Sequence, residues 1–502
     1  MKIRLLSTIL LSGSLFATAQ TKMAADINPT GDSNPMWLTG FGNRVIFFAD
    51  NGVNGAELMA YSASDTAAKL IYDLNPGMAG SVSWYNNRKM AVAGSRVFFP
   101  ADNGTTGTEL YVWGGVDSVA PVMAADINPG FGSSDINEMY IMGDRLYFGA
   151  YNTANGNELW SYNLSDGYTQ RLTDLIAGNG SSFPANLIAY KDKLYFTASN
   201  GTTGNELYAY TPSTNTTALV ADIYAGNISS SPQGLTVINN KLYFSAYTAS
   251  FGRELYSFDG TNLLRHTNID NASGDGVTQV NNGDLQLVWY KNKIYFSGND
   301  GVSGNQLWQF NPANGVASKV YDINPSGYSN PQNFVLYAGK MFFSADDGTH
   351  GDEVWSYDGV SNPKLVADIE INQGSFPTNF SVVRTNLYFS AYTLDKGTEL
   401  YQIKDSAALN VQNTRFDAQV KVFPNPTANV ATIQISSNND LQLGYVITDM
   451  NGRVIARSDV KTYVAGTNNV TVDMATLAAG IYQYRLLDAT GTMMAAGSIQ
   501  KQ

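Results

Sequence analysis

One loop of the chain gathers most of the residues that could carry acid–base chemistry. Residues 346–353 read Asp-Asp-Gly-Thr-His-Gly-Asp-Glu, so four carboxylates lie beside one of only two histidines in the sequence. Paired carboxylates of this kind can protonate a glycosidic oxygen and activate water or a nucleophile. The alternative is that the loop is a solvent-exposed acidic turn without a catalytic role. The candidate catalytic residues are Asp346, Asp347 and Glu353, and the candidate binding residues are Asp346, Asp347, His350 and Asp352.

A second set of acids recurs along the chain at equivalent places. A glutamate sits in seven copies of the motif Gly-x-Glu-Leu or Gly-x-Glu-Val, and Gln306 replaces it in the eighth. The seven are Glu57, Glu109, Glu158, Glu206, Glu254, Glu353 and Glu399. Such a ring of acids could bind cations or sugar hydroxyls. Because every copy needs the residue, we predict instead that it accepts hydrogen bonds from the backbone of the preceding turn.

An aspartate also recurs just before the motif Ile-Asn-Pro and its variants, as in Asp26, Asp126 and Asp322. Calcium requires several oxygen ligands from one loop, and this pattern supplies scattered ones. Turn formation before proline and glycine accounts for the aspartates without a metal. Calcium is therefore the one cofactor that the pattern leaves open, and we expect no other cofactor or metal.

These residues must be positioned by repeated elements. The glycine before the acid falls at Gly55, Gly107, Gly156, Gly204, Gly252, Gly304, Gly351 and Gly397, a spacing of 46 to 52 residues. Around each glycine, short apolar runs alternate with turn residues: in residues 185–222 two such runs flank Lys191-Asp192, and two more follow. Four short antiparallel strands in each period are typical of a β-propeller blade.

The first residues of the repeated region predict how the array closes. No fourth strand follows the last repeat, but residues 22–26 resemble an isolated fourth strand ahead of the first one. We therefore predict an all-β fold with an eight-bladed β-propeller, residues 20–404, in which this N-terminal strand completes the last blade. Closure would leave few exposed strand edges. An open eight-unit solenoid is the alternative.

The repeat resembles a known class, the bacterial ELWxxDGT-type secreted repeat proteins. The residues that carry the resemblance are Glu158-Leu159-Trp160 and Glu353-Val354-Trp355 followed by Asp358-Gly359, and it covers roughly residues 20 to 404. The resemblance implies a propeller and says little of ligand or activity. Most copies lack the full Asp-Gly-Thr ending.

Composition restricts the environment and the partners of the chain. A net charge of -12 disfavours nucleic acid as a partner, and the sequence has no cysteine for disulfides or nucleophilic catalysis. Lys2 and Arg4, an apolar run and a small-residue site predict a signal peptide, residues 1–19, cut between Ala19 and Gln20. An N-terminal membrane anchor is the alternative, although the run is short for a bilayer. We expect no transmembrane segment.

The C-terminal residues depart from the repeat. Pro424, Asn425 and Pro426 open the segment, Asn451 and Gly452 mark a hairpin, and Gly480 and Tyr482 begin a later strand. In this order the motifs resemble the type A C-terminal sorting domain of the type IX secretion system, and an accessory sugar-binding sandwich is the alternative. We assign residues 420–502 to this domain, an Ig-like β-sandwich, after a linker, residues 405–419.

The resemblance implies the type IX secretion machinery as a partner and a Gram-negative host. The protein is then extracellular or attached to the outer cell surface. The sequence favours a non-catalytic binding or adhesion role toward glycans or partner proteins, on the loops of one propeller face. An extracellular polysaccharide hydrolase or lyase is the alternative.

Overall fold

The computed structural model describes residues 20–82, 90–271, 273–278, 285–371, 373–404, 418–437, 440–449, 454–464, 466–488 and 493–502. The predicted signal peptide, most of the predicted linker, and the hairpin residues Asn451 and Gly452 lie outside the described residues. Within them the chain forms strands, turns and loops but no helix, and none of the described segments is a helix capable of spanning a membrane.

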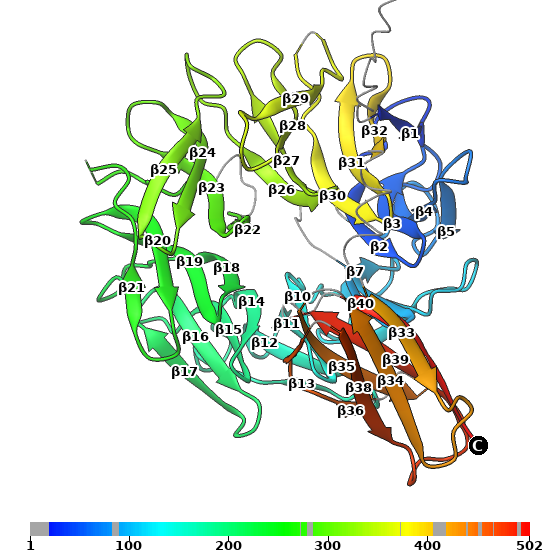
Figure 1. Ribbon diagram of the computed structural model, residues 1–502. Coiled ribbons are helices and arrows are strands. Elements are labelled where there is room, and N and C mark those ends of the chain that lie inside the picture. The colour runs from blue at the N-terminus through cyan, green and yellow to red at the C-terminus, as the bar shows by residue number, and fades with distance from the viewer. Residues whose placement is uncertain are drawn as a thin grey trace, which may run out of the picture.

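Eight antiparallel four-stranded sheets are present in the described residues, and Figure 1 shows them arranged around a common centre. We number them sheets 1 to 8 in chain order, from β2–β5 to β30–β32. Sheets 1 to 7 each consist of consecutive strands, whereas sheet 8 contains β30, β31, β32 and β1. The arrangement is propeller-like, as the period of the sequence predicts.

Within each sheet the first strand lies nearest the common centre and the fourth strand lies farthest from it. The first strands are β2 (Met36–Phe41), β6 (Ala91–Ala93), β10 (Met139–Met142), β14 (Ala185–Tyr190), β18 (Gln233–Ile238), β22 (Val288–Tyr290), β26 (Gln332–Tyr337) and β30 (Thr378–Val383). The second strands are β3 (Arg44–Asp50), β7 (Arg96–Asp102), β11 (Arg145–Asn152), β15 (Lys193–Ser199), β19 (Lys241–Thr248), β23 (Lys293–Asn299), β27 (Lys340–Asp346) and β31 (Asn386–Thr393). The third strands are β4 (Ala56–Tyr61), β8 (Thr108–Trp113), β12 (Gly156–Asn163), β16 (Asn205–Thr211), β20 (Gly252–Phe258), β24 (Asn305–Asn311), β28 (Asp352–Tyr357) and β32 (Gly397–Lys404). The fourth strands are β5 (Lys69–Tyr72), β9 (Val122–Ala125), β13 (Thr169–Arg171), β17 (Thr216–Ala221), β21 (Leu263–Arg265), β25 (Val316–Tyr321), β29 (Lys364–Ala367) and β1 (Gln20–Ala25).

Tight turns join the first and second strands of the sheets. Asn239 and Asn240 both have positive φ, 48° and 56°, as do Lys191 and Asp192 at 47° and 59°. Two successive left-handed residues match the twist of the flanking strands, which is why two-residue hairpins favour this geometry. The turns therefore fix the register of each hairpin.

The N-terminal strand pairs with the last repeat. In β1, Gln20 lies opposite Lys404 and Met23 lies opposite Tyr401, both in β32, and Figure 1 shows β1 at the outer edge of sheet 8. The predicted pairing of residues 22–26 with the eighth unit is confirmed, and the observed strand begins two residues earlier.

The core is divided among the interfaces between sheets. Within the described residues, each pair of consecutive sheets shares one apolar cluster. At the interface of sheets 8 and 1, Val45 and Phe47 pack with Tyr388 and Leu400, all at most 1% exposed. Since no sheet encloses a core alone, each depends on its two neighbours for burial.

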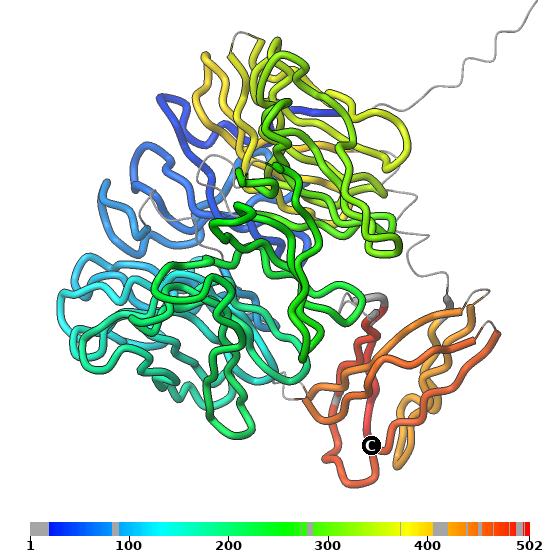
Figure 2. Tube along the Cα trace, turned by 90° about the vertical axis from the view of Figure 1, so that its left-hand side faces the viewer, coloured from blue at the N-terminus to red at the C-terminus, as the bar shows by residue number. Residues whose placement is uncertain are grey.

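The C-terminal residues form two further antiparallel sheets. One contains β33 (Ala418–Phe423), β34 (Val430–Ser437) and β38 (Gly466–Asp473), and the other contains β35 (Leu441–Asp449), β36 (Val454–Arg457), β37 (Lys461–Tyr463), β39 (Gly480–Asp488) and β40 (Met493–Lys501). Ile433, Ile447 and Leu486 belong to the apolar cluster between them. Figure 2 shows these strands, orange to red, gathered in one unit.

Candidate functional site

Two kinds of loop meet at one end of the sheets, and we call them together the junction face. They are the loops between second and third strands (51–55, 103–107, 153–155, 200–204, 249–251, 300–304, 347–351 and 394–396) and those that lead from a fourth strand to the next sheet (26–35, 73–82, 126–138, 172–184, 222–232, 266–271, 273–278, 322–331, 368–371 and 373–377).

A serine in the second kind of loop joins one sheet to the next at seven of the eight junctions. Between sheets 3 and 4, the Ser182 amide donates to the Asn157 carbonyl (2.9 Å), and the Ser182 carbonyl accepts from the Ser199 amide (2.9 Å). The equivalent junction serines are Ser33, Ser81, Ser134, Ser230, Ser329 and Ser375, which are at most 1% exposed. Between sheets 5 and 6, Gly276 and Val277 make the same backbone bonds. The serine recurs at the period of the repeat, a signal that our sequence reasoning missed.

The recurring glutamate binds this same loop. In sheet 4, Glu206 is fully buried and accepts from the amides of Ile223 (3.0 Å) and Ser230 (2.8 Å) and from the Ser230 hydroxyl (2.5 Å). The prediction of a structural acceptor is confirmed, but the predicted donor is wrong. The donating amides belong to the loop that follows the fourth strand. The start of the third strand, where the glutamate lies, is next to that loop, so the glutamate does not bind the turn that precedes it in the sequence.

Burial sets the acidity of these carboxyl groups. Desolvation raises the pKa of Glu57, Glu109 and Glu254 to about 7, although each accepts hydrogen bonds that act to lower it. Desolvation also raises the pKa of Glu206, Glu353 and Glu399. The junction face thus rests on a set of buried acids without a cationic partner at hydrogen-bonding distance in the described contacts.

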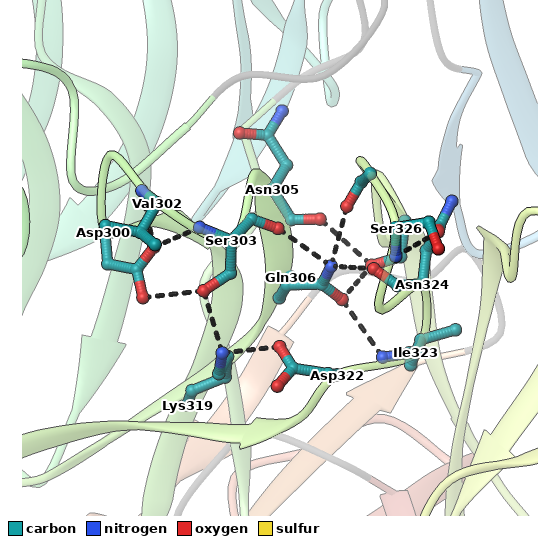
Figure 3. Close-up of polar contacts among 12 residues, drawn as sticks. Asp300, Val302, Ser303, Asn305, Gln306, Lys319, Asp322, Ile323, Asn324 and Ser326 are labelled. Carbon is teal, nitrogen blue, oxygen red and sulfur yellow. Dashed lines mark hydrogen bonds and ion pairs between the residues drawn. The ribbon is translucent and has the colours of Figure 1, made fainter.

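Gln306 fills the same place in sheet 6 (Figure 3). Its side-chain oxygen accepts from the Ile323 amide (3.1 Å) and the Ser329 hydroxyl (2.8 Å), as a glutamate would. Its amide nitrogen donates to the carbonyls of Ser303, Asn324 and Gly327. An uncharged side chain therefore fulfils the role, which supports a structural reading of the whole set.

The aspartates at the ends of the fourth strands make local contacts. Asp26 pairs with Lys396 (3.0 Å), Asp322 pairs with Lys319 (2.5 Å), and Asp222 accepts from the Gly226 amide (3.2 Å). The last contact closes a turn as predicted. Throughout the described ranges, no three His, Asp or Glu side chains form a group that could hold a metal ion.

The structure brings together three of the predicted binding residues in one turn. Asp347 accepts from the amides of Thr349 and His350 (2.9 Å each), and its second oxygen contacts His350 Nδ1 (2.8 Å). Asp346 accepts from the Gly348 amide (2.6 Å). Burial acts to raise the pKa of Asp347, but the hydrogen bonds from His350 and Thr349 outweigh it and lower the pKa. The bond to Asp347 raises the pKa of His350.

The same turn occurs in other sheets with different residue types. Asp300 accepts from the amides of Val302 and Ser303, and Asn200 accepts from those of Thr202 and Thr203. Asp347 is thus the sheet 7 version of a turn that the fold uses repeatedly. The two neighbouring aspartates of this loop therefore belong to a repeated turn and do not by themselves indicate a catalytic site.

Asp352 and Glu353 occupy the start of β28 and diverge from there. Asp352 lies opposite Asp346 in the strand register; burial, and then the charge of Asp346, raise its pKa to about 6. Its Oδ1 atom is buried and has no hydrogen-bond partner. Glu353 is fully buried and accepts from the Glu370 amide (3.1 Å) and the Ser375 hydroxyl (2.6 Å). Successive strand residues point to opposite faces, so Glu353 does not join the solvent-facing acids.

The sorting-domain motif lies against the last strand. Asn425 accepts from the Gln500 amide (2.7 Å) and donates to the Ser498 carbonyl (3.0 Å), and the Phe423–Pro424 and Asn425–Pro426 bonds are cis. Gly480 begins β39, and the Tyr482 hydroxyl donates to the Ala478 carbonyl (2.9 Å). The opening motif therefore holds β40 in place.

Comparison with known proteins identifies the C-terminal part. Residues 421–497 match the model of the secretion system C-terminal sorting domain. This domain directs export by type IX secretion to the cell surface. No curated protein matches the chain.

Several solved structures are similar at low identity. PorZ, a surface component of the type IX secretion system of Porphyromonas gingivalis, is 12% identical over 93% of this chain and 75% of its own, with a TM-score of 0.31. The extracellular domain of BT3049, a hybrid two component system of B. thetaiotaomicron, is 11% identical over 93% and 67%, with a TM-score of 0.40. A puromycin-hydrolyzing peptidase of Mycobacterium tuberculosis is 10% identical over 84% and 61%, with a TM-score of 0.45.

Proposed function

We propose that the chain is an exported, non-catalytic binding protein that acts outside the cell or on its outer surface, toward glycans or partner proteins. Its parts are a signal peptide (1–19), a closed eight-bladed β-propeller (20–404), a linker (405–419) and an Ig-like sorting domain (420–502). The sorting domain engages the type IX secretion machinery, and the junction face presents the binding surface.

One observation carries the non-catalytic reading. The acids that could pair for catalysis are already used by the fold: Glu353 accepts from the Glu370 amide and the Ser375 hydroxyl, and Asp347 closes a turn. A general acid or base must be able to reach a substrate proton. A fully buried carboxylate with its oxygens occupied by protein donors does not meet this condition.

Closure of the propeller is supported by contacts between its two ends. The Ser33 amide donates to the Thr398 carbonyl (3.1 Å), and the Ser33 carbonyl accepts from the Asp50 amide (2.9 Å). The junction between sheets 8 and 1 therefore has the same bonds as the internal junctions. A closed ring gives the loops a rigid support, which favours a binding role.

One observation favours the alternative of a polysaccharide hydrolase or lyase. Asp352, with its pKa raised to about 6, faces Asp346 across the strand pair. A carboxyl group whose pKa is raised beside a second carboxyl group is typical of a general acid. In that case Asp346 and Asp352, rather than Glu353, would be the catalytic pair.

Secretion of the full chain by a type IX-competent bacterium tests the export route. We expect the full chain to reach the medium or become accessible to protease on intact cells, and a chain lacking residues 421–502 to stay inside the outer membrane. A chain with Phe131→Asn is the control for a surface change that should leave export intact. Equal export with and without the C-terminal residues would contradict the proposed route.

An activity screen on mixed polysaccharides separates the two functions. The full chain is compared with Asp352→Asn, Asp347→Asn and Glu353→Gln. The proposal predicts no turnover in any of them, together with binding on a glycan array or in a pull-down from intact cells. Turnover by the full chain that Asp352→Asn abolishes would establish the enzyme instead.

A further inference from the structure

Two phenylalanines occupy a repeat position that four other junctions give to small polar residues. The residue after the junction serine has left-handed φ at six described junctions, namely Asn34 (45°), Asp135 (45°), Phe183 (50°), Ser231 (43°), Asn330 (46°) and Phe376 (49°). Asparagine, aspartate and serine tolerate this conformation, whereas a bulky residue there is a strained outlier. Phe183 and Phe376 are therefore costly choices for the fold.

Packing does not explain these two side chains. Phe183 is 61% exposed and Phe376 is 52% exposed. A strained backbone that holds an aromatic ring in solvent gains little burial energy in return. Strain of this kind concentrates at ligand-binding positions, where the surrounding structure maintains it.

Each phenylalanine is hydrogen-bonded through its backbone to a residue that has a polar side-chain atom without a partner. The Phe183 amide donates to the Asn157 carbonyl (3.3 Å), and Asn157, 6% exposed, has a buried Oδ1 with no hydrogen-bond partner. The Phe376 amide donates to the Asp352 carbonyl (3.0 Å), and Asp352 has a buried Oδ1 in the same condition. Among the residues at this third-strand position in the described sheets, Asn157 and Asp352 alone carry such an oxygen. Two independent irregularities thus coincide at the same two junctions.

The two junctions are related by the symmetry of the ring. Phe183 leads into β14 of sheet 4 and Phe376 leads into β30 of sheet 8, and these strands lie on opposite sides of the common centre (Figure 1). Both phenylalanines belong to the junction face, because both follow a junction serine. The two places are therefore equivalent in construction and separate in space.

The chemistry of the pair selects a ligand class. An exposed ring offers an apolar surface, and the adjacent oxygens are acceptors that need a donor. Sugars supply both, with hydroxyl donors around an apolar ring face. Asp346 and Asp352 lie together at one of the two places, and the chain carries a net charge of -12, so anionic ligands are disfavoured.

We propose that Phe183 with Asn157, and Phe376 with Asp352, form two equivalent subsites for a neutral glycan. The ring stacks on the sugar, and a shift of the strained loop opens the buried oxygen to a ligand hydroxyl. The inference rests on the proposed binding function and narrows it to a substrate class. It assigns the ligand two independent places on one chain.

Binding to an oligosaccharide array tests the subsites in the full chain. The array carries neutral, uronic and sialylated oligosaccharides, and the best neutral one is then titrated by calorimetry. We expect about two molecules bound per chain, about one after either Phe183→Asn or Phe376→Asn, and at least about tenfold weaker binding after both. Phe131→Asn, which removes a ring that is 90% exposed on another junction loop, is the matched control and should bind as the unchanged chain does.

Melting temperatures and glycan binding together show whether the subsites or the proposed binding function is wrong. Because asparagine suits the left-handed backbone, the two variants should melt at the same or a higher temperature, and a fall of several degrees would show that the rings are structural. Unchanged glycan binding by the double variant would overturn the subsites and leave the proposed function standing. If the full chain binds no neutral glycan, the inference fails. A pull-down from intact cells that also captures nothing would then remove the proposed function too.

Discussion

At the scale of single residues, a buried acceptor, glutamate in seven repeats and Gln306 in the eighth, determines how one sheet meets the next. Glu109 accepts from the amides of Ile127 (2.7 Å) and Asn128 (3.4 Å), two residues of the loop that leads to sheet 3. The loop would otherwise bury these amides without acceptors. A side chain from one sheet thus shapes the entry to its neighbour.

Substitution of Glu206 separates the acceptor role from the charge. Glu206→Ala leaves two amides and the Ser230 hydroxyl without their acceptor, so we expect the free energy of unfolding to fall by about 3 kcal/mol. Glu206→Gln should cost much less, because Gln306 serves in this place in sheet 6. Urea unfolding measures both. An equal loss in the two variants would show that the charge matters and the acceptor does not.

Stability should depend on pH through the same acids. The folded pKa of Glu57, Glu109 and Glu254 is about 7, above the unfolded value of 4.5. Folding therefore favours the protonated form, and this contribution is fully present below about pH 4.5 and lost as the pH rises through about 7. Each group contributes at most about 3 kcal/mol.

Melting temperatures measured between pH 5 and pH 8 test this dependence. We expect a higher melting temperature at pH 5 than at pH 8, and a smaller difference in Glu57→Gln, which cannot titrate. Below pH 3.8 the opposite trend should begin, because Asp300 and Asp347 have lowered pKa values in the folded state and lose their turn contacts on protonation. A melting temperature that rises steadily from pH 5 to pH 8 would refute the assignment.

At the scale of elements, much of the repeat could be read from the sequence. The four strands predicted in residues 185–222 are β14, β15, β16 and β17, and the predicted turn Lys191-Asp192 lies between the first two. Turn residues and apolar runs determine these elements locally. The pairing of β1 was also predictable, because its sequence copies the fourth strands.

Other features depend on contacts that no local pattern contains. The sequence places Glu353 among the acids of its loop, but β28 begins at Asp352, and the Glu353 side chain points to the buried face. The donors to the recurring glutamates lie 13 or more residues farther along, and those to Glu399 lie near the start of the described chain. The strain at Phe183 arises from the left-handed backbone that follows the junction serine at six described junctions. Such relations appear only when neighbouring sheets are in place.

A cysteine pair tests the pairing of β1 with β32. Lys22 lies opposite Gln402, and the chain has no cysteine of its own. Lys22→Cys with Gln402→Cys should form a disulfide on oxidation, run faster on a non-reducing gel, and gain up to about 4 kcal/mol of stability. Lys22→Cys with Thr217→Cys, on the outer strands of two different sheets, is the control. Equal cross-linking in both pairs, or none in the first, would count against the pairing.

At the scale of the whole molecule, the junctions are not equal in strength. Between sheets 5 and 6, Gly276 stands where the other junctions have serine, and a Cβ atom there would lie 2.3 Å from Glu254 Oε1. Glu254 therefore accepts its hydroxyl hydrogen bond from Thr267, which lies directly after the fourth strand of the same sheet. The Val277 amide still donates to the Arg253 carbonyl (3.0 Å), and the Ser273 hydroxyl donates weakly to the Ser250 carbonyl (3.4 Å). Gly276 has no hydroxyl to bind the buried glutamate as the junction serines do.

Hydrogen exchange should find this junction the first to open. We expect the amides of Val277 and Asn299 to exchange about tenfold faster than those of Ser81 and Asp102, which flank a complete junction. Ser81→Ala should bring the exchange at the latter pair close to that at the former. If all four amides exchange alike, the hydroxyl bond contributes nothing to the junction.

The pairing of β1 with β32, which joins the two ends of the ring, has a consequence for how the molecule is made. Ile27 donates its amide to Glu399, which is 372 residues away in the sequence. A ribosome or translocation channel releases the first of these segments long before the second, so the leading strand must wait, unpaired, until nearly everything else has emerged. A chain that is terminated too early would keep unpaired edges on β1 and on its last strand. The pairing of β1 with β32 can therefore form only in a chain that has been made as far as its eighth sheet.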